Sequence, residues 1–185
     1  MKYKKLTGII LKKQNYREAD QILTVWTRES GKIRCLAKAL RLPKSKLSFA
    51  CQDLSEVELD LVGKNLPTLI GAKPLRQFKS LREDLKKTAI GFYAVELMLK
   101  MTADEHPNLE AFNLLSDFLH NLDELDYAAQ YDQLLDLFCL NLLDALGFKV
   151  PEDSRVLNHG KINKFIEYII ERNIKSEAFL WMTRF

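Results

Sequence analysis

The sequence lacks any long run of apolar residues. The longest, such as LFCLNLL at Leu137 to Leu143, is far shorter than the roughly 20 residues needed to cross a bilayer. The N-terminal MKYKKLTGII is basic, but it has neither the apolar stretch nor the small-residue cleavage site of a signal peptide. These absences predict a cytoplasmic protein without a membrane partner.

Cysteines and catalytic motifs are also scarce. The three cysteines, Cys35, Cys51 and Cys139, are far apart and show no CxxC spacing, so we expect reduced and buried thiols. No GxGxxG, GxxxxGK[ST], HExxH or GxSxG motif occurs. The three histidines are too scattered to predict a metal site. The sequence therefore predicts a protein that is not an enzyme and that needs no cofactor or metal.

Charge is divided unequally along the chain, although its formal net charge is only +3. Residues 1–80 contain 17 Lys or Arg and 7 Asp or Glu, whereas residues 81–185 contain 11 and 18. The most basic segment is GKIRCLAKALRLPKSK at 31–46, where six of 16 residues are cationic and none is acidic. Such a division predicts one module that faces a polyanion and a second that does not.

The first 80 residues have the pattern of short strands. The segments LTGIILKK, QILTVWT, KIRCLAK, SEVELDLV and PTLIGAKPL alternate or are rich in branched residues, and turn residues separate them. In the fourth segment, Val57, Leu59 and Leu61 are expected to face the core and the acidic residues between them to face solvent. Five such strands predict a small barrel of the oligonucleotide-binding (OB) type.

From Ser80 onward, apolar residues recur at the helical spacings of three and four. Ser80 and Glu83 are expected to form a capping box, Pro107 to start a second helix, and Gly147 to end a third. The predicted fold class is therefore α+β, with a five-stranded OB-fold barrel over residues 1–79 followed by an all-α helical bundle over residues 80–185.

The basic segment divides between a strand and a loop. Alternation on the strand projects Lys32, Arg34 and Lys38 from one face, while the residues between them enter the core. The following loop, LRLPKSK, adds three more cations where a flexible wall can close on a phosphate backbone. Tyr16 is a candidate platform for base stacking, whereas Trp26 is expected in the core.

Several motifs resemble those of the bacterial recombination mediator family RecO. They are NYREADQILT, TRESGKIR and AKALRLPKS, all within residues 8–47, and LREDL at 81–85. The resemblance implies an OB-fold barrel followed by a helical bundle. It also implies a nucleoid-associated protein that binds single- and double-stranded DNA and anneals complementary strands. The implied partners are RecR, the C-terminal tail of single-stranded DNA-binding protein and, indirectly, RecA.

The resemblance also assigns DNA-binding residues. They are Lys32, Arg34, Lys38, Arg41, Lys44 and Lys46, with Lys12, Arg17 and Tyr16 as additional candidates. Many members of the family carry four cysteines as a zinc module after the long helix, but GFKVPEDSRVLNHGKINK at 147–164 contains none. The chain therefore resembles a variant without this zinc site, and whether RecR binds without the module stays open.

Two other functions are compatible with the residues. One is an RNA-binding module, because a basic barrel does not by itself distinguish ribose from deoxyribose. The other is a scaffold whose helical half makes the functional contacts and whose basic charge is incidental.

Overall fold

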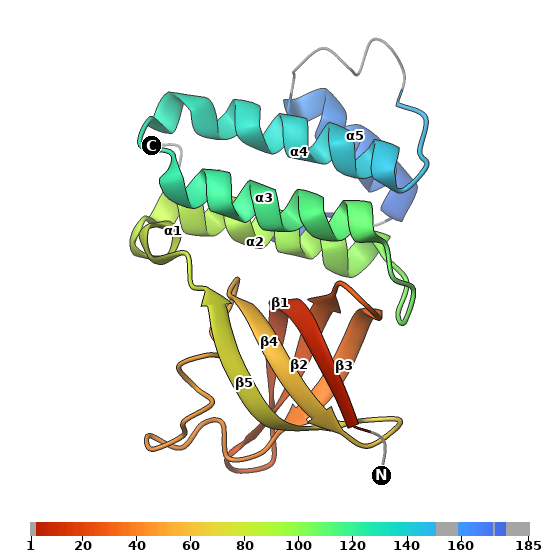
Figure 1. The fold of residues 1–185 in the computed structure, drawn as a ribbon. Coiled ribbons are helices and arrows are strands. Elements are labelled where there is room, and N and C mark those ends of the chain that lie inside the picture. Colours follow the sequence, from red (N-terminus) through yellow and green to blue (C-terminus); the bar gives the residue numbers. More distant parts are fainter. Residues whose placement is uncertain (1–2, 151–158, 172, 177–185) are drawn as a thin grey trace. The chain divides into compact units, whose positions relative to one another are not determined.

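The computed structural model describes residues 3–150, 159–171 and 173–176 of the chain (Figure 1). Its elements are β1 (Tyr3–Tyr16), β2 (Asp20–Thr27), β3 (Gly31–Ala37), β4 (Glu56–Val62), β5 (Thr68–Arg76), α1 (Lys79–Glu83), α2 (Leu85–Met101), α3 (Leu109–Glu124), η1 (Ala128–Gln130), α4 (Tyr131–Ala145) and α5 (His159–Ile170). This order confirms the predicted α+β class, with five strands followed by helices. None of the described helices is long and apolar enough to cross a membrane.

The chain forms two compact units, which we call the barrel unit and the helical unit. The barrel unit contains the chain up to Gln77 and also the later segment Ala103–Phe112. The helical unit contains Phe78–Thr102 and the chain from Asn113 onward. The return of residues 103–112 to the barrel unit was not anticipated from the sequence.

The barrel is closed, with the strand order β1-β2-β3-β5-β4. Strand β1 pairs with β4 through residues 3–9 and with β2 through residues 8–16. A register shift between Ile10 and Lys12 marks a bulge, which bends the strand so that it can serve both neighbours. Strands β3 and β5 pair in parallel, and only Leu36 and Thr68 are partners there. The barrel therefore closes through one short parallel contact.

Alternating side chains form the core of the barrel. Val57, Leu59 and Leu61 on β4 are buried, as their spacing predicted, and Cys35 and Ala37 of β3 join the same cluster. Burial raises the pKa of Cys35 to about 12, with a further contribution from Cys51. The expectation of buried thiols is confirmed, because Cys51 and Cys139 are buried as well.

The loop between β3 and β4 is anchored to the barrel by its own apolar residues. Leu40, Ala50, Cys51 and Leu54 are all buried. Successive turns connect these anchors, with backbone hydrogen bonds such as Ser45 N to Leu42 O (2.9 Å) and Cys51 N to Leu47 O (2.9 Å). The exposed part of the loop is therefore held at both ends.

The segment 103–107 lies against the start of β3. The Glu105 amide donates to the Lys32 carbonyl at 2.9 Å, and Asp104 forms a parallel bridge with Lys32. Gly31 has a φ of +67°, and a Cβ added there would lie 2.3 Å from the carbonyl oxygen of His106. Glycine is therefore required at this position by both its backbone conformation and the close approach of the segment.

The predicted capping box at Ser80 and Glu83 is wrong. The N-cap of α1 is Phe78, which has no side-chain capping bond, and the helix breaks at Asp84. Asp84 is extended and its side chain accepts from the Lys87 amide at 2.9 Å, so Asp84 caps α2. The hydroxyl of Ser80 instead accepts from Lys87 Nζ at 2.9 Å.

The other predicted helix ends are partly correct. Helix α3 begins at Leu109 and not at Pro107, and Asn108 caps it, because the Asn108 side chain accepts from the Ala111 amide at 2.9 Å. Gly147 ends α4 as predicted, with a φ of +82°. The Gly147 amide donates to the Asp144 carbonyl and the Phe148 amide to the Leu143 carbonyl, both at 2.9 Å, which is the Schellman pattern.

Polar side chains join three helices inside the helical unit. The Tyr93 hydroxyl of α2 donates to Asn163 Oδ1 of α5 at 2.6 Å, and both residues are buried. His159 Nδ1 lies 2.8 Å from Asp136 Oδ1 of α4, and its ring packs 5.5 Å from that of Tyr93. Because buried polar groups need partners, this network fixes how α2, α4 and α5 pack.

Candidate nucleic-acid interface

The outer face of β1, β2 and β3 carries cations beside apolar side chains. Cross-strand partners in antiparallel strands project to the same side of a sheet. The register therefore makes two outward rows, Lys12–Thr24–Arg34 and Gln14–Ile22–Leu36. Lys12, Arg34 and Gln14 are exposed, and the other three are half-buried. This face thus offers positive charge together with small apolar surfaces.

Hydrogen bonds tie two loops together at one end of this face. The Ala39 amide donates to Asp20 Oδ1 at 2.8 Å, and the Arg41 amide donates to the carbonyl of Ala19 at 3.0 Å. The Arg41 guanidinium also donates to the Glu18 carbonyl at 3.0 Å. The first turn of the β3–β4 loop is therefore fixed beside the β1–β2 turn.

These hydrogen bonds bring four of the predicted residues together. Tyr16 ends β1 and is exposed, and the Arg17 guanidinium lies 5.2 Å from the centre of its ring. Lys38 and Arg41, both exposed, lie in the neighbouring turn. An aromatic ring and three cations at one loop pair are the groups that a nucleic-acid strand contacts by stacking and by phosphate pairing.

Lys44 and Lys46 lie further along the β3–β4 loop and are exposed. The apolar neighbours Leu42 and Phe49 are exposed as well, Phe49 to 62%. Trp26 is only 1% exposed, which confirms that it is a buried residue and not a stacking platform.

Lys32 is placed differently from the other predicted cations. It is only 8% exposed, and its ammonium lies 3.4 Å from Asp104 Oδ1. The alternation of β3 puts its side chain on the same outer face as Arg34, but residues 103–107 cover that end of the strand. The sequence pattern of β3 contains no signal of this, because Asp104 comes from a segment far along the chain.

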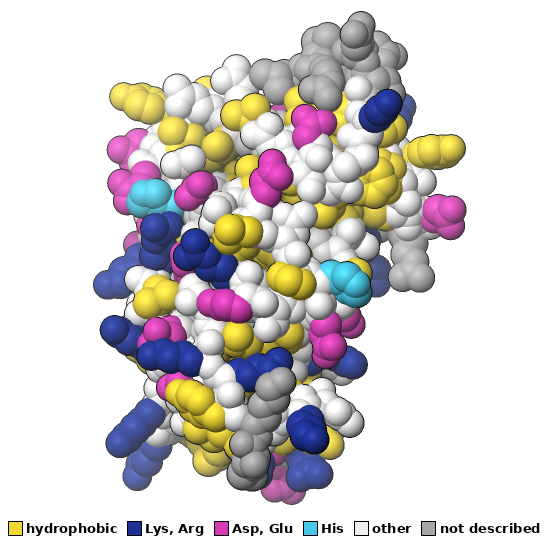
Figure 2. All heavy atoms as spheres, turned by 45° about the vertical axis from the view of Figure 1, so that its right-hand side comes forward, with side chains coloured by type: hydrophobic (Ala, Val, Ile, Leu, Met, Phe, Trp, Pro, Cys, Tyr) yellow, Lys and Arg dark blue, Asp and Glu magenta, His cyan; other side chains and the backbone are white. Residues whose placement is uncertain are grey.

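The cations of the barrel unit fall into two groups. Four have acidic partners: Lys5–Glu58 (2.9 Å), Lys13–Asp53 (3.0 Å), Lys32–Asp104 (3.4 Å) and Arg76–Glu56 (3.8 Å). Within the described part of the chain, seven of the predicted cations have no ion pair: Lys12, Arg17, Arg34, Lys38, Arg41, Lys44 and Lys46. These acids thus neutralise the cations near them, and the cations without ion pairs lie mainly on the outer face of β1 and β3 and on the β3–β4 loop. Figure 2 shows many Lys and Arg side chains over the barrel in the lower part of the view.

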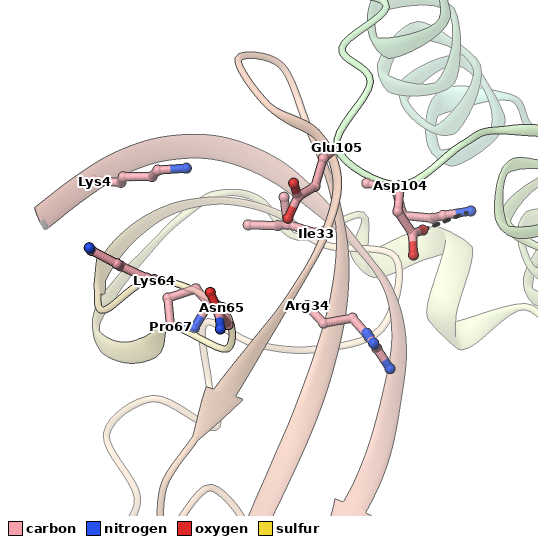
Figure 3. A pocket seen from close by; sticks show the side chains of 9 residues that line it. Lys4, Ile33, Arg34, Lys64, Asn65, Pro67, Asp104 and Glu105 are labelled. Atoms are coloured by element: carbon pink, nitrogen blue, oxygen red, sulfur yellow. Dashed lines mark ion pairs between the residues drawn. The ribbon is translucent and has the colours of Figure 1, made fainter.

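A polar hollow of about 100 Å³ opens beside the first half of β3, where β5 does not pair with it. Its lining includes Lys4, Arg34, Lys64, Asn65, Asp104 and Glu105 (Figure 3). Lys4 and Lys64 were not predicted as site residues. They come from the start of β1 and from the β4–β5 turn, so only the closure of the barrel brings them near Arg34.

The described ranges contain no candidate metal centre. In residues 3–150, 159–171 and 173–176, no group of three or more His, Cys, Asp or Glu side chains is placed to hold a metal ion. Cys139 lies fully buried in α4, and burial raises the pKa of its thiol.

The fold and this surface together define a class: a five-stranded barrel with an exposed cationic face, followed by a helical unit. Comparisons with known proteins then give the family. Residues 1–78 match the family model "Recombination protein O N terminal", and residues 82–176 match "Recombination protein O C terminal". The chain belongs to the RecO family.

Relatives named "DNA repair protein RecO" show the same similarity. The protein of Dehalococcoides mccartyi (strain CBDB1) is 37% identical over 89% of this chain and 64% of its own length. The protein of Heliobacterium modesticaldum is 35% identical over 87% of this chain and 57% of its own length. That of Listeria monocytogenes serotype 4b is 32% identical over 81% and 58%. The chain thus spans less than two thirds of the length of these curated relatives.

Proposed function

We propose that this chain is a DNA-binding recombination mediator in DNA repair. It binds single- and double-stranded DNA and anneals complementary strands, and it catalyses no covalent reaction. The observation that carries the proposal is the set of six exposed cations on the outer face of β1 and β3 and on the β3–β4 loop, none of which has an ion pair among the described residues. Family membership supports it, because the relatives are named as DNA repair proteins.

The DNA path runs along this outer face. Lys12 and Arg34 contact phosphates over the strands, and Lys38 and Arg41 contact them at the tied loops. Lys44 and Lys46 contact the backbone further out, and the ring of Tyr16, beside Arg17, stacks on a base. Stacking of this kind contributes about 1–3 kcal/mol per base without demanding a sequence, which suits a protein that anneals any complementary pair.

Lys32 has a supporting role in this proposal. Its ammonium already has a carboxylate partner, so it holds residues 103–107 against β3 and contributes less to phosphate binding than Arg34 does.

The proposed protein partners rest on family membership and not on the surface described above. We propose that the chain acts with RecR and with single-stranded DNA-binding protein, whose acidic C-terminal tail it contacts, and that it thereby helps to load RecA. An acidic tail fits a cationic part of the helical unit such as exposed Lys164 on α5.

An annealing assay with a charge-matched control tests the central claim. The Lys44→Ala/Lys46→Ala double variant should anneal complementary oligonucleotides at least tenfold more slowly than the wild type, because two phosphate contacts are lost. The control is Lys149→Ala/Lys164→Ala, which removes the same charge from exposed positions in the helical unit and should anneal normally. Equal loss in both variants would show that only net charge matters.

A salt titration tests the mechanism of binding. Six contacts, by Lys12, Arg34, Lys38, Arg41, Lys44 and Lys46, predict a slope of about −4 for the logarithm of the affinity for single strands against the logarithm of salt concentration, at about −0.7 per contact. Matched RNA competitors belong in the same experiment. Binding that is insensitive to salt, or that is tighter for RNA, would overturn the proposal.

A further inference from the structure

Helices α3 and α4 contain no Lys or Arg. Between Lys100 and Lys149 the chain has ten Asp or Glu residues and no cation at all. The two helices lie beside one another in the helical unit (Figure 1). The rings of Phe118 and Phe138 pack between them, tilted by 33° with centroids 4.4 Å apart. Their shared surface is therefore the part of the chain least suited to contact a nucleic acid, because phosphates are repelled there.

Two hollows open along the seam between α3 and α4. One, of about 100 Å³, has a mainly apolar lining that includes Leu114, Phe118, Leu134, Leu137 and Phe138. The second, of about 330 Å³, is lined by Asn121, Glu124, Leu125 and Leu134. The hollows share Asn121 and Leu134 and therefore adjoin one another, and we call the two together the α3–α4 groove.

The groove combines exposed apolar surface with uncompensated negative charge. Leu137 is 51% exposed on α4 and lines the first hollow. Asp117 and Glu124 line the two hollows and are exposed, and neither has an ion pair within the described part of the chain. Among the residues that the structure describes, no Lys or Arg lines either hollow. Apolar side chains bordered by acidic ones favour a ligand that carries both apolar and basic groups.

We propose that the α3–α4 groove binds a basic segment with an apolar face from a partner protein. Its apolar side chains cover Leu137 and enter the hollows, and its Lys or Arg side chains pair with Asp117 and Glu124. This is the helix-in-groove mode of peptide recognition, in which apolar residues at helical spacing anchor the segment. Charge complementarity also selects against DNA and against an acidic tail, so this surface is separate from the DNA path.

Two synthetic peptides of about 14 residues serve as probes, and both place leucines at helical spacing. One has lysine at the remaining positions and the other has glutamate. Fluorescence anisotropy with the whole chain should show binding of the lysine peptide and at least tenfold weaker binding of the glutamate peptide. Equal binding of both peptides, or binding of neither, would overturn the proposal.

Variants of the protein locate the site. Leu137→Ser and Asp117→Asn/Glu124→Gln should each weaken binding of the lysine peptide about tenfold. Leu85→Ser is the matched control, because Leu85 is 64% exposed on α2 and lines neither hollow, so this change should have no effect. A loss in Leu85→Ser equal to that in Leu137→Ser would overturn the assignment.

Two further measurements separate this site from other interpretations. Lys44→Ala/Lys46→Ala should bind the lysine peptide normally even where its annealing is impaired, so the two proposals can fail independently. Analytical ultracentrifugation of the wild type should show no dimer that Leu137→Ser dissociates. Such a dimer would assign the groove to a second copy of the chain and would overturn the partner proposal.

Discussion

Several charged side chains of the barrel unit and of the helical unit lie in contrasting surroundings. On the barrel, Lys12, Arg34 and Lys44 face solvent, and none of them has an ion pair among the described residues. In the helical unit, Lys87 and Asp136 are buried and hydrogen-bonded to groups on other helices. At these positions, the same residue types are exposed to solvent in the barrel unit and packed inside the helical unit.

Whether a charged side chain contributes to the stability of the fold depends on its surroundings. A buried charge persists only when other groups satisfy it, so removing one partner leaves the other unpaired at a large cost. An exposed charge on a loop costs the fold little, so its presence needs a reason outside stability. Removing a buried cation of the helical unit should therefore lower stability strongly, whereas removing an exposed cation of the barrel unit should change it little.

The largest effect on stability is expected at Lys87. Its ammonium donates to Ser80 Oγ and to the Asp123 carbonyl, both at 2.9 Å, and thereby joins α1, α2 and the end of α3. Lys87→Ala should lower the free energy of unfolding by about 3 kcal/mol, because the carbonyl loses a charged donor in a buried place. Urea unfolding followed by circular dichroism measures the change.

A second substitution at this position separates hydrogen bonding from packing. Lys87→Met keeps most of the volume of the stem but removes the donors. We expect it to lose most of the stability that Lys87→Ala loses. Wild-type stability in Lys87→Met would show that the buried ammonium has no structural role. It would contradict the claim that this buried charge supports the packing of the helical unit.

A smaller, pH-dependent effect is expected at Glu96 of α2. Its carboxylate pairs with Lys100 at 2.7 Å and accepts from the Lys175 and Ser176 amides at 2.9 and 2.7 Å. Burial favours a raised pKa, but the hydrogen bonds from Lys100, Ser176 and Lys175 outweigh it and lower the pKa of Glu96 to about 2. The ionised side chain therefore holds residues 175–176 on α2.

The direction of the pH dependence follows from this lowered pKa. Between about pH 4.5 and 2 the unfolded chain binds a proton at this position that the folded chain does not, so protonation favours unfolding. The contribution of Glu96 is complete above about pH 4.5 and is lost as the pH falls toward 2. Urea unfolding at pH 6 and pH 3 should show a smaller acid loss for Glu96→Gln than for the wild type. Equal acid losses would contradict the prediction.

The sequence predicted the elements whose signal is local. The strands of the barrel alternate because one face is buried, so the inward positions of Val57, Leu59 and Cys35 followed from spacing alone. The helix end at Gly147 also followed, because a left-handed C-terminal residue favours glycine. The prediction at Ser80 was wrong because a second capping residue, Asp84, follows it closely. The side chain of Asp84 caps α2, whose residues are largely buried, and the local pattern at Ser80 does not reveal this.

Features that depend on distant segments were out of reach. The pairing of Lys32 with Asp104 and the approach of Lys64 to Arg34 arise only when the barrel closes and residues 103–107 return to it. The absence of Lys and Arg from residues 101–148 is visible in the sequence. The hollows that make this acidic stretch a candidate binding surface form only when α3 packs on α4, so the sequence did not predict them. Arg34, Lys38, Arg41, Lys44 and Lys46 were predicted as a group because they lie in one basic segment of the chain.

The smallest effect on stability is expected for Lys44→Ala/Lys46→Ala, the variant that should anneal strands much more slowly. Lys44 and Lys46 are exposed, and the loop that carries them is anchored by Leu40 and Cys51, which the substitutions leave intact. Lys44→Ala/Lys46→Ala should therefore change the free energy of unfolding by less than about 0.5 kcal/mol, the usual range for surface positions. Urea unfolding of the variant used for annealing gives the value directly. A loss comparable to that of Lys87→Ala would mean that these lysines support the fold, and slower annealing would then no longer identify a phosphate-binding surface. An unchanged midpoint with slower annealing leaves ligand binding as the reason for the positive charge of this loop.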